Sequence, residues 1–187
     1  MTNLYKKITH FVFELSNLKK FKHCGTKFAG IKDPDSLAEH ALRASQIAYI
    51  LAKLEEADIG KCILMTLTHD NGEIRVGDQH KISRRYFDIK PFEHKAFADQ
   101  TRNLPRKIGR PLVELHQEFE DQKTLESHIA RDADILETAF QAKEYYDNGY
   151  KTAKLWIESV KKQLKTTSAK KILKEMEKTH FTEWLTS

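Results

Sequence analysis

Apolar residues recur at helical spacing along most of the chain. The stripe over residues 5–18 consists of Ile8, Phe11, Val12, Leu15 and Leu18. This spacing predicts an amphipathic helix, and residues 35–54 repeat it with a stronger stripe. Ser36 and Glu39 match a capping box at the start of the second helix, although Asp33 is an alternative cap.

The remaining sequence continues the helical pattern. Residues 59–68 are almost entirely apolar, which predicts a deeply buried helix that runs into His69 and Asp70. Further helices are expected at residues 92–104, 112–119, 124–147, 151–165 and 168–185, with Gly109 and Pro111 separating the first two. The pattern predicts an all-α fold, with one domain over residues 1–187. Its core would span roughly residues 5–150, and helices at 151–185 would close it.

Composition and charge narrow the class of protein. The 32 basic and 27 acidic residues are interleaved, so the net charge of +5 is not concentrated on one segment, and no nucleic-acid partner is expected. A mildly basic protein suits a small anionic ligand such as a phosphate ester. Two cysteines, Cys24 and Cys62, form no disulfide framework, which indicates a reducing compartment. With no signal peptide and no apolar stretch of membrane-spanning length, we expect a cytoplasmic protein without a membrane partner.

Costly polar groups stand at positions where the pattern predicts a core. His40 lies on the inner stripe of its helix, His69 and Asp70 end the most apolar helix, and Asp134 lies within residues 124–147. Alone, His40 reads as a hydrogen-bonded core histidine and Asp134 as a solvent-facing acid. A purely structural role is harder to assign to Asp70, because an acid at the carboxyl end of a helix interacts unfavourably with the helix dipole.

A divalent cation would account for all of these positions together. Two imidazoles and two carboxylates suit Mn, Fe, Co, Ni or Mg, and the lack of thiolates argues against a structural zinc site. Such a ligand set leaves coordination positions for water and a substrate oxygen. The sequence therefore predicts a catalytic metal site.

The strings PDSLAEH at 34–40 and HDNGEIRVGD at 69–78, with a distant Asp, resemble the HD-domain phosphohydrolases, and among them the 5′-deoxynucleotidases. The resemblance spans roughly residues 5–150. It implies a single compact helical HD domain with about seven to nine helices around a buried metal site. It also implies one divalent metal ion, a homodimer, and four metal ligands: His40, His69, Asp70 and Asp134. Asp132 is a competing candidate, but residues two apart on a helix point to nearly opposite faces, so both cannot ligate.

The resemblance further implies a reaction. Glu73 and Asp78 match the acidic pair beside the metal, with Glu73 as general acid or base and Asp78 orienting water or binding the sugar hydroxyl. The expected activity is removal of the 5′-phosphate from nucleoside monophosphates, in particular deoxyribonucleotides. A related enzyme on a nucleoside triphosphate, a cyclic nucleotide or an alarmone is the first alternative. A non-catalytic, metal-stabilised nucleotide-binding module is the second.

One stretch departs from the family pattern. Relatives carry an Arg, and often a Trp, in the loop before the first metal-binding helix, and residues 22–28 contain neither. The notable candidates for the missing roles are His23 or Lys27 for phosphate binding and Phe28 for stacking. Further candidates for a phosphate clamp are the basic residues Arg75, Lys81, Arg84 and Arg85, with solvent exposure as the alternative.

Overall fold

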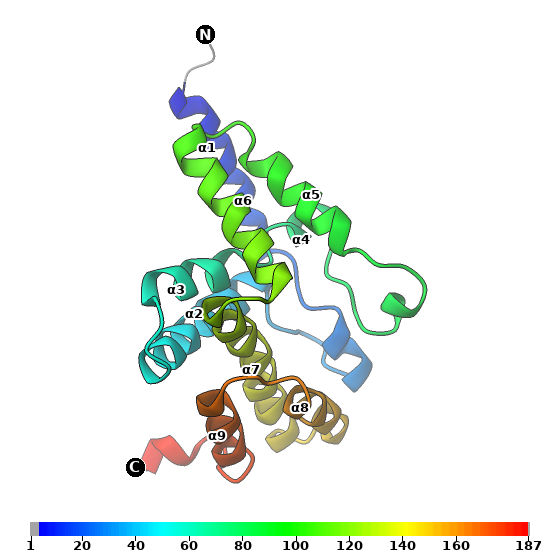
Figure 1. Ribbon diagram of the computed structural model, residues 1–187. Coiled ribbons are helices and arrows are strands. Elements are labelled where there is room, and N and C mark those ends of the chain that lie inside the picture. Colours follow the sequence, from blue (N-terminus) through cyan, green and yellow to red (C-terminus); the bar gives the residue numbers. More distant parts are fainter. Residues whose placement is uncertain (1–3, 187) are drawn as a thin grey trace.

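The computed structural model describes residues 4–186 of the chain, which fold into helices joined by loops (Figure 1). Within that range there is no β-strand, and the single isolated bridge joins Lys22 to Ser36. The α-helices are α1 (Leu4–Leu15), α2 (Leu37–Leu54), α3 (Ile59–Thr68), α4 (Glu73–Val76), α5 (Lys90–Thr101), α6 (Arg106–Asp121), α7 (Leu125–Asp147), α8 (Lys154–Lys161) and α9 (Thr167–Met176). The predicted all-α fold is confirmed. No helix of the described residues has the length and apolarity needed to cross a bilayer.

Two capped helices, α2 and α7, form the centre of the fold. The Ser36 hydroxyl accepts from the backbone N–H of Glu39 while the Glu39 carboxylate accepts from the Ser36 N–H, which completes the predicted capping box. Thr124 and Ser127 cap α7 in the same reciprocal way. These caps fix where each helix begins, and therefore which side chains face inward.

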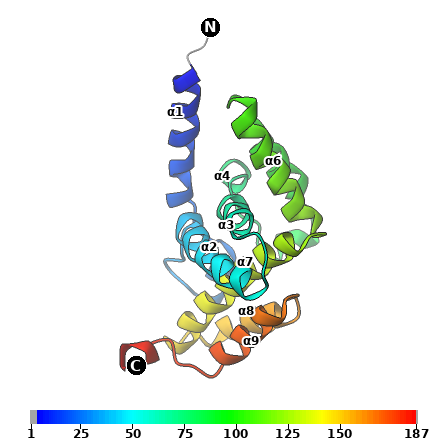
Figure 2. The same ribbon diagram turned by 60° about the vertical axis from the view of Figure 1, so that its left-hand side comes forward.

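The main core joins the C-terminal helices to the centre of the molecule. Its buried apolar side chains come from α2, α3, α7, α8 and α9 and include Leu51, Cys62, Leu136, Ile157 and Leu173. Transfer of these side chains from water supplies the main driving force for docking α8 and α9 against α7. Figure 2 shows α7, α8 and α9 gathered at one end of the molecule.

Three expected elements differ from the structure. The helix expected over residues 168–185 ends as α9 at Met176. The helix α3 is not buried all round, because Leu64 and Leu67 remain 37% and 43% exposed. The boundary between the helices expected at 92–104 and 112–119 does not lie at Gly109 and Pro111. It lies at residues 102–105, and α6 runs without a break from Arg106 through both residues. Gly109 serves close packing instead: a Cβ there would lie 2.6 Å from the Thr101 carbonyl oxygen at the end of α5.

Helix α1 is the least integrated element of the fold. It extends away from the helices at the other end of the molecule (Figures 1 and 2), and none of its residues is buried. Apolar side chains on it, including Val12 and Phe13, are largely exposed. An amphipathic helix of this length is marginal in water when nothing covers its apolar face.

Candidate metal centre and active site

Four predicted ligands converge where α2, α3 and α7 meet. His40 comes from α2, His69 and Asp70 follow the last turn of α3, and Asp134 comes from α7. The Nε2 atom of His40 lies 3.3 Å from Asp134 Oδ1 and 3.8 Å from Asp70 Oδ2. The Nε2 atom of His69 lies 3.1 Å from Asp70 Oδ1 and 3.5 Å from Asp134 Oδ1. Positions as far apart as 40 and 134 thus share one small site.

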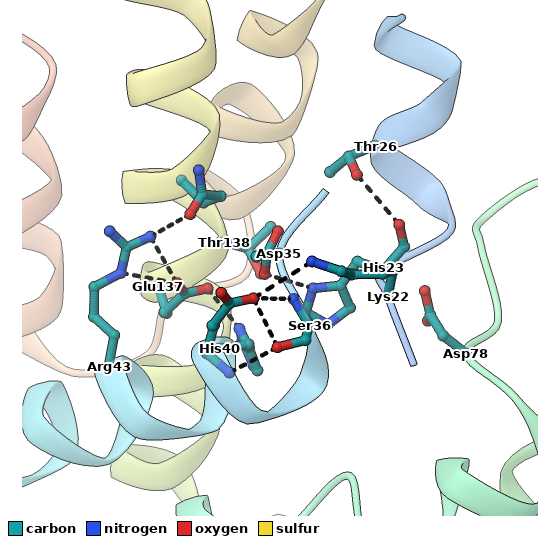
Figure 3. Close-up of polar contacts among 12 residues, drawn as sticks. Lys22, His23, Thr26, Asp35, Ser36, His40, Arg43, Asp78, Glu137 and Thr138 are labelled. Carbon is teal, nitrogen blue, oxygen red and sulfur yellow. Dashed lines mark hydrogen bonds and ion pairs between the residues drawn. The ribbon is translucent and has the colours of Figure 1, made fainter. Parts of the chain in front are cut away.

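The other ring nitrogen of each histidine is already engaged. His69 Nδ1 lies 2.6 Å from the Thr66 carbonyl oxygen, one of the carbonyls left unpaired at the end of α3. A carbonyl can only accept, so His69 Nδ1 carries the hydrogen. His40 Nδ1 lies 2.5 Å from Glu137 Oε2, and Figure 3 shows Glu137 held between His40 and Arg43. In the neutral rings, both Nε2 lone pairs therefore point toward carboxylate oxygens.

With both rings neutral, the Nε2 lone pairs and the carboxylate oxygens of Asp70 and Asp134 all face one another as hydrogen-bond acceptors. Such a group of acceptors attracts a proton or a cation. Burial lowers the pKa of His40, but Glu137 and Asp134 more than offset it and raise that pKa well above its ordinary value. Burial raises the pKa of Asp134, but His69, His40 and Arg131 more than offset it and hold that pKa well below its ordinary value. Two imidazole nitrogens and two carboxylates are a donor set that fits a divalent cation, and outer hydrogen bonds of this kind orient such ligands.

Asp132, the competing candidate, faces the opposite side of α7. It is fully buried and accepts from the backbone N–H groups of Lys165 and Thr166 and from the Thr166 hydroxyl. Its carboxylate is therefore occupied at the start of α9, where it complements the helix dipole. The helical phase of α7 directs Asp134, and not Asp132, toward the histidines.

The predicted acidic pair lines the cavity beside these four residues. Glu73 is 8% exposed, and its Oε2 atom has no hydrogen-bond partner within the described residues. Burial raises the pKa of Glu73 well above its ordinary value, and the charges of Asp70 and Asp78 raise it further. Asp78 is anchored through Oδ2, which accepts from the Cys24 N–H at 2.7 Å. The surroundings of Glu73 thus favour its protonated form.

The cavity itself has a volume of about 400 Å³, within the range of small-molecule sites. Of the residues expected to bind substrate, His23, Lys81 and Arg84 line it. His23 is oriented by Asp35, with Nδ1 to Oδ2 at 2.8 Å. Lys81 bonds to the Ser159 hydroxyl.

The structure does not bring the other candidates to the cavity wall. Arg75 points to α1, where its guanidinium bonds to both carboxylate oxygens of Glu14 at 2.5 and 2.9 Å. Phe28 packs edge-on against the ring of His80, which itself lines the cavity. Lys27 is exposed on the 3-10 turn before α2.

Several lining residues were not found from the sequence. Arg131 and Glu137 flank Asp134 by three residues on either side, so the helical repeat of α7 indicates both once Asp134 is chosen. Lys90 lies beside Glu93 and Glu120, with Nζ at 3.0 and 3.3 Å from their carboxylate oxygens. Trp156 of α8 also lines the cavity, and no local signal in the sequence indicates it.

Curated relatives share most of their length with this chain. The 5′-deoxynucleotidase HDDC2 of Dictyostelium discoideum is 34% identical over 138 residues, which cover 68% of this chain and 72% of that protein. The 5′-deoxynucleotidase HDDC2 of Homo sapiens is 26% identical over 151 residues, which cover 80% and 74%.

Solved structures agree with this fold. A conserved hypothetical protein from Pyrococcus furiosus superposes with a TM-score of 0.76 at 23% identity, covering 91% of this chain and 99% of that one. A predicted metal-dependent phosphohydrolase from Magnetospirillum magnetotacticum gives a TM-score of 0.73 at 22% identity, covering 94% and 91%. The sequence profile described as HD domain matches residues 15–177. With its histidines and aspartates gathered as that name implies, the chain belongs to the HD domain family.

Proposed function

We propose that this protein is a metal-dependent phosphohydrolase that removes the 5′-phosphate from nucleoside monophosphates, with deoxyribonucleotides preferred. The observation that carries the proposal is the set of two Nε2 lone pairs and two carboxylates facing one another beside a buried acid. Relatives named 5′-deoxynucleotidase support the substrate class.

One divalent cation, of Mn, Co, Fe, Ni or Mg, would be held by His40, His69, Asp70 and Asp134. When bound, it supplies a water of lowered pKa and withdraws charge from a phosphoryl oxygen. The chain's own contribution is to orient the ligands: Glu137 fixes the ring of His40, and the Thr66 carbonyl fixes that of His69.

Glu73 would hold the proton that the leaving 5′-oxygen needs. Its raised pKa favours the protonated form, and its Oε2 has no partner within the described residues, so it is suited to donate. Asp78, anchored by Cys24, would orient the attacking water or bind a sugar hydroxyl with its second carboxylate oxygen.

Basic residues at the cavity would bind the phosphate. Lys90 and Arg131 are already paired with carboxylates. Lys81 and Arg84 line the cavity, and neither has a carboxylate within 4.0 Å among residues 4–186. We infer that these two cations and His23 take the phosphate role for which residues 22–28 contain no arginine.

A phosphate-release assay tests the proposal. The chelated protein is reloaded separately with Mn, Co or Mg and given ribo- and deoxyribonucleoside mono-, di- and triphosphates, cyclic nucleotides and an alarmone. We expect release only in loaded protein and mainly from deoxynucleoside monophosphates. Preferred release from another nucleotide would favour the first alternative. Saturable nucleotide binding with no release from any of them would favour the binding module.

We also infer a homodimer in a reducing cytoplasm. The free thiols of Cys24 and Cys62 support that compartment. A second copy would cover the exposed apolar side chains of α1, among them Phe13, which is 71% exposed. Light scattering should give twice the chain mass, and Phe13→Glu should shift it toward one. A monomeric parent protein would contradict the homodimer and leave the proposed activity intact.

A further inference from the structure

Helix α8 forms one wall of the cavity and brings its only aromatic side chain there. Trp156, Ser159 and Val160 follow one stripe of α8, Gln163 lies in the turn directly after it, and all four line the cavity. We propose that this wall is the base-binding subsite, with Trp156 as the surface on which the nucleobase stacks. The inference rests on the proposed function, because it names the part of the site that recognises the nucleoside.

Trp156 is placed for two contacts. It is half-buried, packs against the main core, and also borders the cavity. Ile135 and Val160 line the cavity with it, so the surface around Trp156 is apolar where the metal end is charged, and Lys81 reaches the edge of this wall through its bond to Ser159. Ile135 directly follows Asp134 on α7, which makes the two ends parts of one continuous site. A nucleoside monophosphate carries the same division, with an apolar ring at one end and a dianion at the other.

Two amides on this side have fixed orientations. The Gln141 side-chain oxygen accepts from Arg43 Nη2 at 2.8 Å, and Arg43 can only donate. The NH₂ group of Gln141 is therefore available as a donor. The Gln163 NH₂ group donates to the carbonyl and hydroxyl oxygens of Ser159 at 3.0 and 3.2 Å, which leaves its oxygen as an acceptor.

Both amides line the cavity. One donor and one acceptor are what the hydrogen-bonding edge of a nucleobase requires, since each base presents both kinds of group. An aromatic face stacks with any base, whereas a sugar phosphate without a base gains nothing from it. This difference separates base recognition from phosphate binding, to which Trp156 offers no charge.

Kinetics with and without the base test the assignment. The substrates are a deoxynucleoside monophosphate and 2-deoxyribose 5-phosphate, which keeps the sugar and phosphate. We expect Trp156→Ala to raise the KM for the nucleotide about tenfold or more, because stacking on an aromatic ring contributes strongly to base binding. The same variant should leave kcat/KM for 2-deoxyribose 5-phosphate unchanged, and Trp156→Phe should restore most of the nucleotide affinity.

The chain supplies a matched control and a second measurement. Leu155 precedes Trp156 on α8 but is 64% exposed and does not line the cavity, so Leu155→Ala should behave as the parent. Trp156 and Trp184 are the only tryptophans, and Trp184 is 71% exposed near the C-terminus. In a Trp184→Phe background, emission reports on Trp156 alone. A 2′-deoxynucleoside 5′-methylenephosphonate, with magnesium, should quench it saturably, whereas 2-deoxyribose 5-phosphate should not.

The outcomes separate the two proposals. Equal loss of activity on both substrates in Trp156→Ala would show that Trp156 only supports the fold, and would overturn the subsite. Absence of quenching by the phosphonate would overturn it as well. Saturable quenching without phosphate release from any nucleotide would support the subsite and contradict the proposed enzymatic function.

Discussion

The two ends of the cavity are built in different ways. At the metal end, His40 and His69 are almost fully buried, and each ring is fixed by a second bond to Glu137 or to the Thr66 carbonyl. At the α8 end, Trp156 is half-buried and Lys81 is held through a single serine hydroxyl. Their supports are a short helix and the loop after α4. The proposed metal ligands thus lie on or directly after long core helices, whereas the groups proposed for recognition lie on elements that can change at low cost to the core.

The largest expected effect comes from removing a ligand at the metal end. We expect Asp70→Ala to lose both the bound cation and turnover, because one of the two carboxylates that neutralise the cation is removed from the set of four ligands. Metal content after dialysis and phosphate release measure the two losses. Full metal occupancy in this variant would remove Asp70 from the ligand set.

Glu73→Ala should separate metal binding from turnover. Its side chain lies beside the four ligands without bonding to them, so metal content should stay at the parent level. Loss of a general acid should lower kcat by about 10²- to 10⁴-fold. Parent-level hydrolysis of deoxynucleoside monophosphates would show that Glu73 does not transfer the proton.

A smaller effect on metal binding is expected from Glu137, which bonds to the ring of His40 on the side away from the proposed metal. Glu137→Gln should weaken metal affinity by about 10- to 100-fold, because the ring of His40 loses its charged partner. Glu144 is the matched control, since it also bonds to Arg43, at 2.5 Å, but does not touch His40. Glu144→Gln should keep the parent affinity in a competition with a metal chelator. Equal losses in the two variants would point to Arg43 as the important group.

At the α8 end, Lys81→Met should act on the phosphate and not on the base. We expect the KM to rise by about tenfold for the nucleotide and for 2-deoxyribose 5-phosphate alike, since a charge-assisted bond is lost. The neighbouring Arg85 does not line the cavity and gives the control Arg85→Met. An effect confined to the nucleotide would place Lys81 at the base.

The smallest effect concerns His116, which is buried behind the metal end between Phe97 and His94. Burial lowers the pKa of His116 from 6.5 to about 4. The folded protein therefore binds this proton only at a lower pH than the unfolded chain does. The contribution to stability is complete above pH 6.5 and is lost as the pH falls toward 4. It amounts to about 3 kcal/mol. Chemical denaturation across this window should show a flatter pH dependence for His116→Gln, and an unchanged slope would contradict the assignment.

The metal end could be predicted from the sequence because its residues stand out locally. A charged group on an otherwise apolar helix face is costly, and that cost makes His40, Asp70 and Asp134 visible. Glu137 and Arg131 follow from the repeat of α7 once Asp134 is chosen. The α8 end could not be predicted in this way, since a tryptophan on an amphipathic helix is ordinary. Only the docking of α8 against α7 shows that Trp156 borders the cavity.

The carboxylate of Asp132 links α7, which carries Asp134, to the C-terminal segment that begins α9. It accepts hydrogen bonds from three donors at the start of α9, whereas Asp134, two positions further on, lies beside the two histidines. Were the chain shortened after α8, Asp132 would lose all three donors, and the core would lose the buried apolar side chains of α9, Leu173 among them. Because Asp134 lies two residues from Asp132 on α7, we expect removal of residues 165–187 to lower the affinity for the proposed cation together with the stability of the fold.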